Sequence, residues 1–322
     1  MNAFRWVLLP SLAAILLTGV VQERLAANPV PGRLAAAGPQ ELAPADDLPV
    51  VQVHRYKMSG RIRPLLFWIG RDDVGLGEIV WRRTDGGVAY ELLIGTDSAK
   101  APRGISRWGY LLEDSRPAGT RVLGVMTTSD EATLSDVSRK LDDGKARGRF
   151  KAIRAYIASG VCRSATETLE TERDFSVRDK AELVPHVVDR LKDAAPREIP
   201  VPSGVRPGFL LAVAELVDGT IAARAAGGDA LRRAKGRRIG YVYGRRLYDL
   251  TLTRAEQTGP PATAKDRNYP VHAEFEVRNV GTGARYTFEL DYATAGALSG
   301  VPTLIRHQPR WWLQAVLTLD DR

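Results

Sequence analysis

Hydrophobic and polar positions alternate most regularly between Val271 and Asp320. The segments Val271–Arg278 and Arg285–Tyr292 both repeat with period two, and a glycine-bearing connection joins them. Alternation on both sides of such a connection predicts a β-hairpin. Trp311–Asp320 continues the same alternation. The pattern therefore predicts three antiparallel strands with one apolar face that can be buried and one polar face that can stay in water.

Shorter strand-like segments are spread along the chain before this block. An Asp-Gly step at Asp85-Gly86 favours a tight turn between two of them. The dense apolar run Leu65–Ile69 precedes Gly70–Gly77, a glycine- and acid-rich segment that we expect to be a loop. The predicted strands are Val51–Met58, Glu78–Arg82, Val88–Ile94, Trp108–Leu112, Arg121–Met126, Phe150–Ala158, Glu167–Arg173, Ile239–Tyr243 and Leu247–Thr253.

Three segments show helical periodicity. Thr128–Gly144 begins with the spacing of a capping box. A second helix begins at Ser176, and Pro185 is expected to kink or divide it. A third begins at Pro207 and ends near Gly219. Because strands and helices do not alternate regularly, the sequence predicts an α+β fold: a mostly antiparallel, curved β-sheet with a few helices inserted in the middle of the chain.

The segment Met1–Ala27 has the layout of an export signal: a basic residue, an apolar run and small residues suited to cleavage. We therefore expect an exported protein, periplasmic or secreted, with an uncleaved N-terminal membrane anchor as the alternative. Residues 28–48 are predicted to be a flexible linker. The prolines of Pro196–Pro207 predict a second linker between lobes 49–195 and 208–322, and a single domain containing both lobes is the alternative.

The chain carries 46 basic and 38 acidic residues, which gives a formal net charge of +8. Export favours a lipid, an anionic membrane surface or another envelope component over nucleic acid as the partner of such a chain. The densest basic cluster includes Arg237, Arg238, Arg245 and Arg246. The alternative is that it forms a solvated strand edge whose charges prevent pairing with another strand. The single cysteine, Cys162, cannot form an internal disulfide and is expected to be buried. The candidate anion-binding residues are Arg237, Arg238, Arg245 and Arg246.

The sequence contains no recognised catalytic or metal-binding motif. The four histidines are not spaced as a paired zinc motif, and the Ser-Gly steps lack the leading glycine of a hydrolase nucleophile turn. We therefore expect no metal and no cofactor. Asp72 and Asp73 form a candidate acid loop that could bind a cation or take part in proton transfer. A turn in which the carboxylates cap backbone amides is the alternative.

Aromatic side chains are the remaining candidates for binding, with ordinary core packing as the alternative. Export, alternating strands and a helical insert together resemble the pattern of exported lipid- and lipoprotein-carrier proteins. The sequence thus predicts a non-enzymatic protein that binds an apolar or amphipathic ligand or an envelope component. Two alternatives stay open: an envelope interaction protein that uses its basic face, and a hydrolase or metal-dependent enzyme built around Asp72 and Asp73. The candidate ligand-binding residues, alongside Trp81 and Trp312, are Phe67, Trp68, Trp108, Tyr110 and Trp311.

Overall fold

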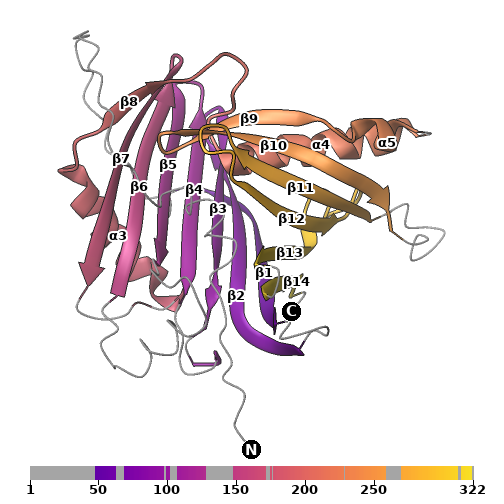
Figure 1. Cartoon of the computed structure of the whole chain (residues 1–322), viewed down its shortest axis with the longest axis horizontal. Coiled ribbons are helices and arrows are strands. Elements are labelled where there is room, and N and C mark those ends of the chain that lie inside the picture. Colours follow the sequence, from indigo (N-terminus) through magenta and orange to yellow (C-terminus); the bar gives the residue numbers. More distant parts are fainter. Residues whose placement is uncertain are drawn as a thin grey trace, which may run out of the picture.

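A computed structural model describes residues 48–62, 69–97, 99–101, 107–127, 148–171, 175, 177–227, 229–258, 270–310 and 313–320. Within these residues, 14 strands form one antiparallel sheet in the order β8-β7-β6-β5-β4-β3-β2-β1-β14-β13-β12-β11-β10-β9 (Figure 1). Strands β1 to β8 thus lie in chain order, and so do β9 to β14. The pairing of β14 with β1 joins the two runs into one sheet.

The first run of strands comprises β1 (Val50–Ile62), β2 (Ile69–Thr84), β3 (Gly87–Thr96), β4 (Trp108–Arg116), β5 (Gly119–Thr127), β6 (Gly148–Ala158), β7 (Val161–Thr171) and β8 (Arg197–Pro200). The second comprises β9 (Arg238–Tyr243), β10 (Arg246–Gln257), β11 (Val271–Asn279), β12 (Arg285–Tyr292), β13 (Pro302–Arg310) and β14 (Leu313–Leu319). The described helices are the short η3 (Val177–Asp179), α3 (Lys180–Lys192), α4 (Phe209–Ala226) and α5 (Ala230–Ala234).

The segment that follows β8 links the first run of strands to the second. Arg206 forms a parallel bridge with Tyr241 of β9. Its backbone N–H donates to the Gly240 carbonyl at 2.7 Å, and its own carbonyl accepts from the Val242 N–H at 3.0 Å. A single residue therefore holds the start of β9 against the chain that leaves β8, immediately before α4 begins.

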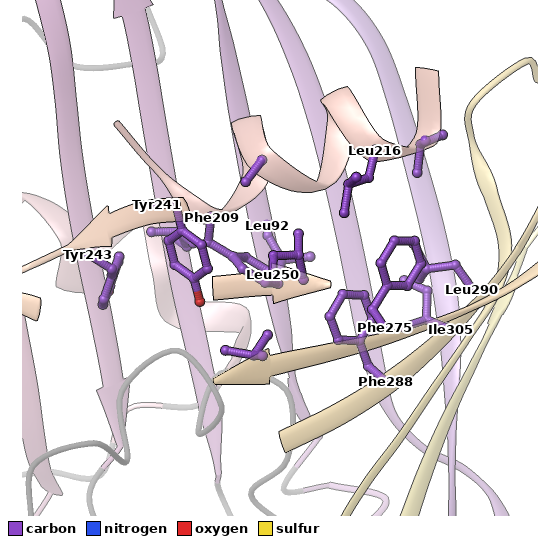
Figure 2. Close-up of a cluster of buried hydrophobic side chains, with 14 of the residues drawn as sticks. Leu92, Phe209, Leu216, Tyr241, Tyr243, Leu250, Phe275, Phe288, Leu290 and Ile305 are labelled. Carbon is purple, nitrogen blue, oxygen red and sulfur yellow. The ribbon is translucent and has the colours of Figure 1, made fainter. Parts of the chain in front are cut away.

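The larger core lies between the two runs of strands, and one face of α4 packs against it (Figure 2). Leu216 and Phe209 of α4 reach this core from above the sheet, and Phe209 contacts Phe288 with ring centroids 5.8 Å apart. We call the sheet surface that faces this core the inner face. The buried residues of α4 share one face of the helix, and Asp218 and Ala222 are exposed on the opposite face.

A second, smaller core covers the opposite surface of the first run, which we call the outer face. Helix α3 lies on this surface, and its Leu183, Val187 and Leu191 side chains are fully buried. They pack with Phe150 of β6 and other apolar residues of β3 to β7. The middle strands of the first run are therefore buried on both faces, which explains the unbroken apolar stretches Trp108–Leu112 of β4 and Val122–Met126 of β5.

The structure is mostly antiparallel sheet with few helices, as the alternation in the sequence predicts. The β2–β3 hairpin and the β11–β12 hairpin lie where they were expected. Helix α3 runs through Pro185. The predicted helix Thr128–Gly144 lies outside the described residues. The division into two lobes and an export signal stays a prediction.

Three local predictions were wrong. Gly70–Gly77 belongs to β2, where a register shift relative to β1 accommodates the irregular sequence. Strand β13 was missed, and it separates β12 from β14. Helix α4 continues past Gly219 to Ala226; Gly219 lies within the helix, where a guanidinium nitrogen of Arg237 occupies the space in which a side chain would begin. The segment Pro196–Pro207 contains β8, and its role as a linker between lobes stays a prediction. Among the described residues, no helix combines the length and apolarity needed to cross a membrane.

Candidate ligand-binding site

A line of polar and aromatic residues crosses four adjacent strands on the inner face. Gln52 of β1 is opposite Trp81 of β2, Trp81 is opposite Tyr90 of β3, and Tyr90 is opposite Glu113 of β4. Directly opposed residues in a sheet point to the same face. We call Gln52, His54, Trp81 and Tyr90 the aromatic row; Glu113 stands at its inner end. Since neighbouring strands are about 4.8 Å apart, the line from Gln52 to Glu113 extends over roughly 15 Å.

The rings of the aromatic row meet edge to face. The Trp81 and Tyr90 ring centroids are 5.9 Å apart at an interplanar angle of 89°, and those of His54 and Trp81 are 6.2 Å apart at 76°. All four residues of the row are half-buried. The His54 Nε2 lies 3.3 Å from the Gln52 Oε1. Burial lowers the pKa of His54, so its ring is neutral at pH 7.

Helix α4 begins directly over the inner end of this row. Glu113 is fully buried, and its carboxylate accepts hydrogen bonds from the backbone N–H of Phe209 at 2.7 Å and of Leu211 at 3.0 Å. The first N–H groups of a helix have no partners within the helix, and a carboxylate supplies them. Gly208 permits this approach, because a Cβ at that position would lie 2.2 Å from a Glu113 carboxylate oxygen.

Two opposing effects set the pKa of Glu113. Burial raises its pKa to about 7, while the N–H groups at the start of α4 oppose that shift. The pKa of this carboxyl group is therefore well above that of an ordinary glutamate. Its field also contributes to raising the pKa of Tyr90, after burial and the Asp218 carboxylate.

A second carboxylate, that of Asp218, is exposed on α4. It contributes to raising the pKa of Tyr90, after burial. Burial and the neighbouring Glu215 raise the pKa of Asp218. Glu215 itself pairs with Arg206, whose Nη2 lies 3.0 Å from the Glu215 Oε1. Within the described part of the chain, by contrast, Asp218 has no hydrogen-bond or ion-pair partner.

The arrangement combines ring faces with polar groups that can still bind. Among the described residues, the Trp81 indole N–H and the Tyr90 hydroxyl have no protein partner, and the aromatic row is partly open to solvent. Such a surface can hold an apolar group against the rings and bind a polar group at Tyr90. The described residues contain no group of three or more His, Cys, Asp or Glu side chains arranged to hold a metal ion.

Two of the predicted ligand-binding aromatics lie on the outer face. Trp108 and Tyr110 are both buried, with exposed fractions of 2% and 4%. The Trp108 indole N–H donates to the Phe175 carbonyl at 2.7 Å, and the Tyr110 hydroxyl lies 3.3 Å from the Glu91 Oε2. Both side chains are thus satisfied within the core beneath α3, and a role in ligand binding stays a prediction. Phe67, Trp68 and Trp311 lie outside the described residues, as does Trp312.

The predicted anion-binding residues lie at two ends of one hairpin. Arg237 and Arg238 are exposed at the start of β9, and an Arg238 Nη lies 3.7 Å from an Asp249 carboxylate oxygen. Arg245 and Arg246 are half-buried beside the turn that joins β9 to β10. At about 3.3 Å per strand residue, the two pairs are roughly 20 Å apart. The structure therefore does not gather the four side chains into one patch.

The candidate acid loop is part of the register shift between β1 and β2. Asp72 and Asp73 are both exposed, and Asp73 has a φ of 54°. Lys100 Nζ lies 2.7 Å from the Asp73 Oδ2. The irregular backbone explains why a small acidic residue occupies position 73, since Asp tolerates the left-handed region better than most residues. A catalytic or cation-binding role for the pair stays a prediction.

Sequence reasoning singled out Trp81 but not its neighbours in the row. Tyr90, Glu113 and Phe209 come from three elements, and no spacing in the chain connects them. One available signal was the acidic residue Glu113 within the apolar strand Trp108–Arg116, because a buried carboxylate needs specific partners. Cys162 is buried as expected; its Sγ lies 3.0 Å from the Gly244 carbonyl, and burial raises the pKa of its thiol to about 12.

No known family model matches the chain, and no curated protein is similar to it in sequence. One similar solved structure is that of a β-barrel-like protein of a domain of unknown function, DUF1849, from Brucella abortus. The two chains are 10% identical, the alignment covers 85% of this chain and 97% of the other, and the TM-score is 0.35. A likeness of this size assigns no ligand or activity to either protein.

Proposed function

We propose that this protein is a non-enzymatic binding protein that takes an amphipathic ligand at the aromatic row. The observation that carries the proposal is the edge-to-face series His54, Trp81 and Tyr90, half-buried beside α4. Aromatic surfaces with a few well-placed polar groups are typical of small-molecule sites. The proposal includes export, which the N-terminal sequence predicts, and it makes a lipid or another envelope component the natural source of the ligand.

The test is direct binding, measured by isothermal titration calorimetry on the full chain purified without detergent. Three ten-carbon probes share one tail and differ in head group: decyltrimethylammonium, decyl maltoside and decyl sulfate, each below its micellar concentration. We expect at least one probe to bind the native protein, and Trp81→Ala to weaken that binding by at least tenfold, because the tail loses its central ring.

The matched control is Tyr156→Ala. Tyr156 is an exposed aromatic residue of β6 whose hydroxyl donates to the Ala118 carbonyl, away from the row. Its removal should leave probe binding unchanged, and circular dichroism checks that both variants are folded. Failure of all three probes to bind the folded native protein would overturn the proposal. Equal weakening by the two substitutions would also do so.

A further inference from the structure

The start of β1, Val50–His54, forms a strand edge that extends past the end of its neighbour. Strand β14 pairs with β1 only from Tyr56 onward. The Arg55 carbonyl accepts from the Asp320 N–H at 2.7 Å, which shows the side of β1 that faces β14. Backbone groups alternate between the two sides of a strand, so the N–H and C=O of Val53 point to this same side. In the part of the chain that the structure describes, no strand pairs with them there.

The side chains along this edge are apolar and exposed. Val50, Val51 and Val53 have exposed fractions of 51%, 50% and 44%. The segment Val50–His54 contains no Lys, Arg, Asp or Glu. Unpaired backbone groups together with exposed apolar side chains make a strand edge that can accept another strand.

The two outermost edges of the sheet, by contrast, carry charged side chains. Strand β8 covers only one end of β7, and the rest of β7 carries the exposed Glu167 and Glu170. At the opposite edge, β9 begins with the exposed Arg238 and is bridged by Arg206. Charges on an edge strand oppose pairing with another chain. The start of β1 lacks this protection.

We propose that the free edge of β1 pairs with the same edge of a second copy of this chain, antiparallel and about a two-fold axis, and so joins two sheets into one. A second copy suits this edge because Val50–His54 is uncharged and meets itself with no like charges opposed. Each copy also supplies exposed valines and unpaired backbone groups. The pairing would bring together two aromatic rows, since each row begins at Gln52 of β1.

Sedimentation velocity of the native protein, purified without detergent, tests the pairing. We expect a dimer at about 50 µM that dissociates on dilution, because a contact of a few residues is small for a protein interface. Val53→Lys should raise the dissociation constant of the dimer by about tenfold or more, because the two-fold axis brings the lysines of both copies into one interface.

The matched control is Val280→Lys. Val280 is an equally exposed valine, with an exposed fraction of 48%, in the turn between β11 and β12. Its substitution should leave the dissociation constant unchanged, and circular dichroism checks that both variants are folded.

Amide hydrogen exchange locates the contact in the native protein without any substitution. In peptides that cover Val50–His54, exchange should slow by about twofold or more between dilute and concentrated protein, while exchange at Glu167 and Glu170 stays constant. Three results would each overturn the inference: a native protein that stays monomeric, a dimer that Val53→Lys leaves intact, or a dimer with unchanged exchange in Val50–His54. None of these measurements depends on ligand binding, so the proposed function is tested separately.

Discussion

The two faces of the first run of strands each bury a glutamate, and they satisfy it in different ways. On the outer face, Glu91 is paired with Arg82, accepts from Lys180 Nζ at 3.0 Å and lies near the Tyr110 hydroxyl. On the inner face, Glu113 accepts only backbone N–H groups from the start of α4 in the bonds described. The outer carboxylate is thus neutralised by side-chain cations, and the inner one relies on a helix terminus.

This difference separates a surface built for stability from one that can still bind. Lys180 also lies over the Tyr110 ring, 5.2 Å from its centroid, so the outer aromatic residue already has its cation. The inner rings, Trp81 and Tyr90, have no such partner among the described residues. Both faces of the sheet place aromatic rings next to a carboxylate. In the part of the chain that the structure describes, the outer ring has a cation partner and the inner rings do not.

The largest expected effect comes from exchanging the tryptophans of the two faces for alanine. Trp108→Ala should lower the free energy of unfolding by about 4 kcal/mol, because it removes a buried ring and leaves a cavity. Trp81→Ala should cost about 1 kcal/mol, since its ring is only half-buried. Urea denaturation of both variants measures the contrast, and similar losses of stability in the two would remove the distinction between the faces.

Removing the charge of Glu91 should have the next largest effect. In Glu91→Gln, the buried Arg82 guanidinium loses its carboxylate, and we expect a loss of about 3 kcal/mol in the free energy of unfolding. The control is Glu198→Gln, which breaks an exposed pair with Arg163 and should cost less than about 1 kcal/mol. A loss for Glu91→Gln as small as that of the control would show that the outer network adds little to stability.

The buried carboxyl group of Glu113 should make the free energy of unfolding depend on pH. The pKa of Glu113 rises from 4.5 to about 7 on folding, so the folded state holds its proton more tightly than the unfolded state. Its contribution to stability is therefore most favourable below pH 4.5, falls as the pH rises from 4.5 to 7, and is constant above that. The total change is roughly 3 kcal/mol, at about 1.4 kcal/mol for each pKa unit.

Glu113→Gln isolates this contribution because it cannot titrate. The difference in the free energy of unfolding between the native protein and Glu113→Gln, measured by urea denaturation from pH 4 to 8, should follow that curve. A difference that is flat with pH would mean that Glu113 titrates alike in the folded and unfolded states.

The smallest of these effects tests the contact between Glu113 and α4 itself. Gly208→Ala would place a Cβ 2.2 Å from the Glu113 carboxylate, and we expect a loss of about 1 to 2 kcal/mol in the free energy of unfolding. Gly70→Ala is the control, since its nearest contact would be an ordinary 3.5 Å to the Arg61 side chain. Equal stabilities of the two variants would show that α4 can shift without cost.

The sequence predicts the sheet better than it predicts the site, for a physical reason. Alternation along a strand records which side chains are buried, so β11 and β12 could be recognised from residues 271 to 292 alone. Strand β13 could not be recognised so easily, because Pro302–Arg310 includes two prolines and alternates weakly. The irregular Gly70–Gly77 was mistaken for a loop because glycines and acidic residues also mark turns.

The aromatic row depends on the registers of three strand pairs and on the position of α4. Gln52 and Tyr90 become neighbours of Trp81 only through these registers. Local sequence sets the strands but not the pairing of one strand with another across the sheet. Trp108 illustrates a second limit, because the sequence around it does not distinguish a tryptophan buried in the core from one that lines a cavity.

The order of the strands also has a consequence for how the molecule folds. Most neighbouring strands in the sheet are consecutive in the chain, but the β1–β14 pair joins Tyr56 to Leu319. Contacts between such distant residues carry a large loop-closure entropy, so we expect this pair to form late. Glu113 of the first run binds the start of α4, and Phe209 of α4 packs on Phe288 of the second run, so the site would be complete only after both runs have docked. A ligand would then bind only molecules that have finished folding. During refolding, the recovery of probe binding should therefore lag behind the recovery of strand signal in circular dichroism.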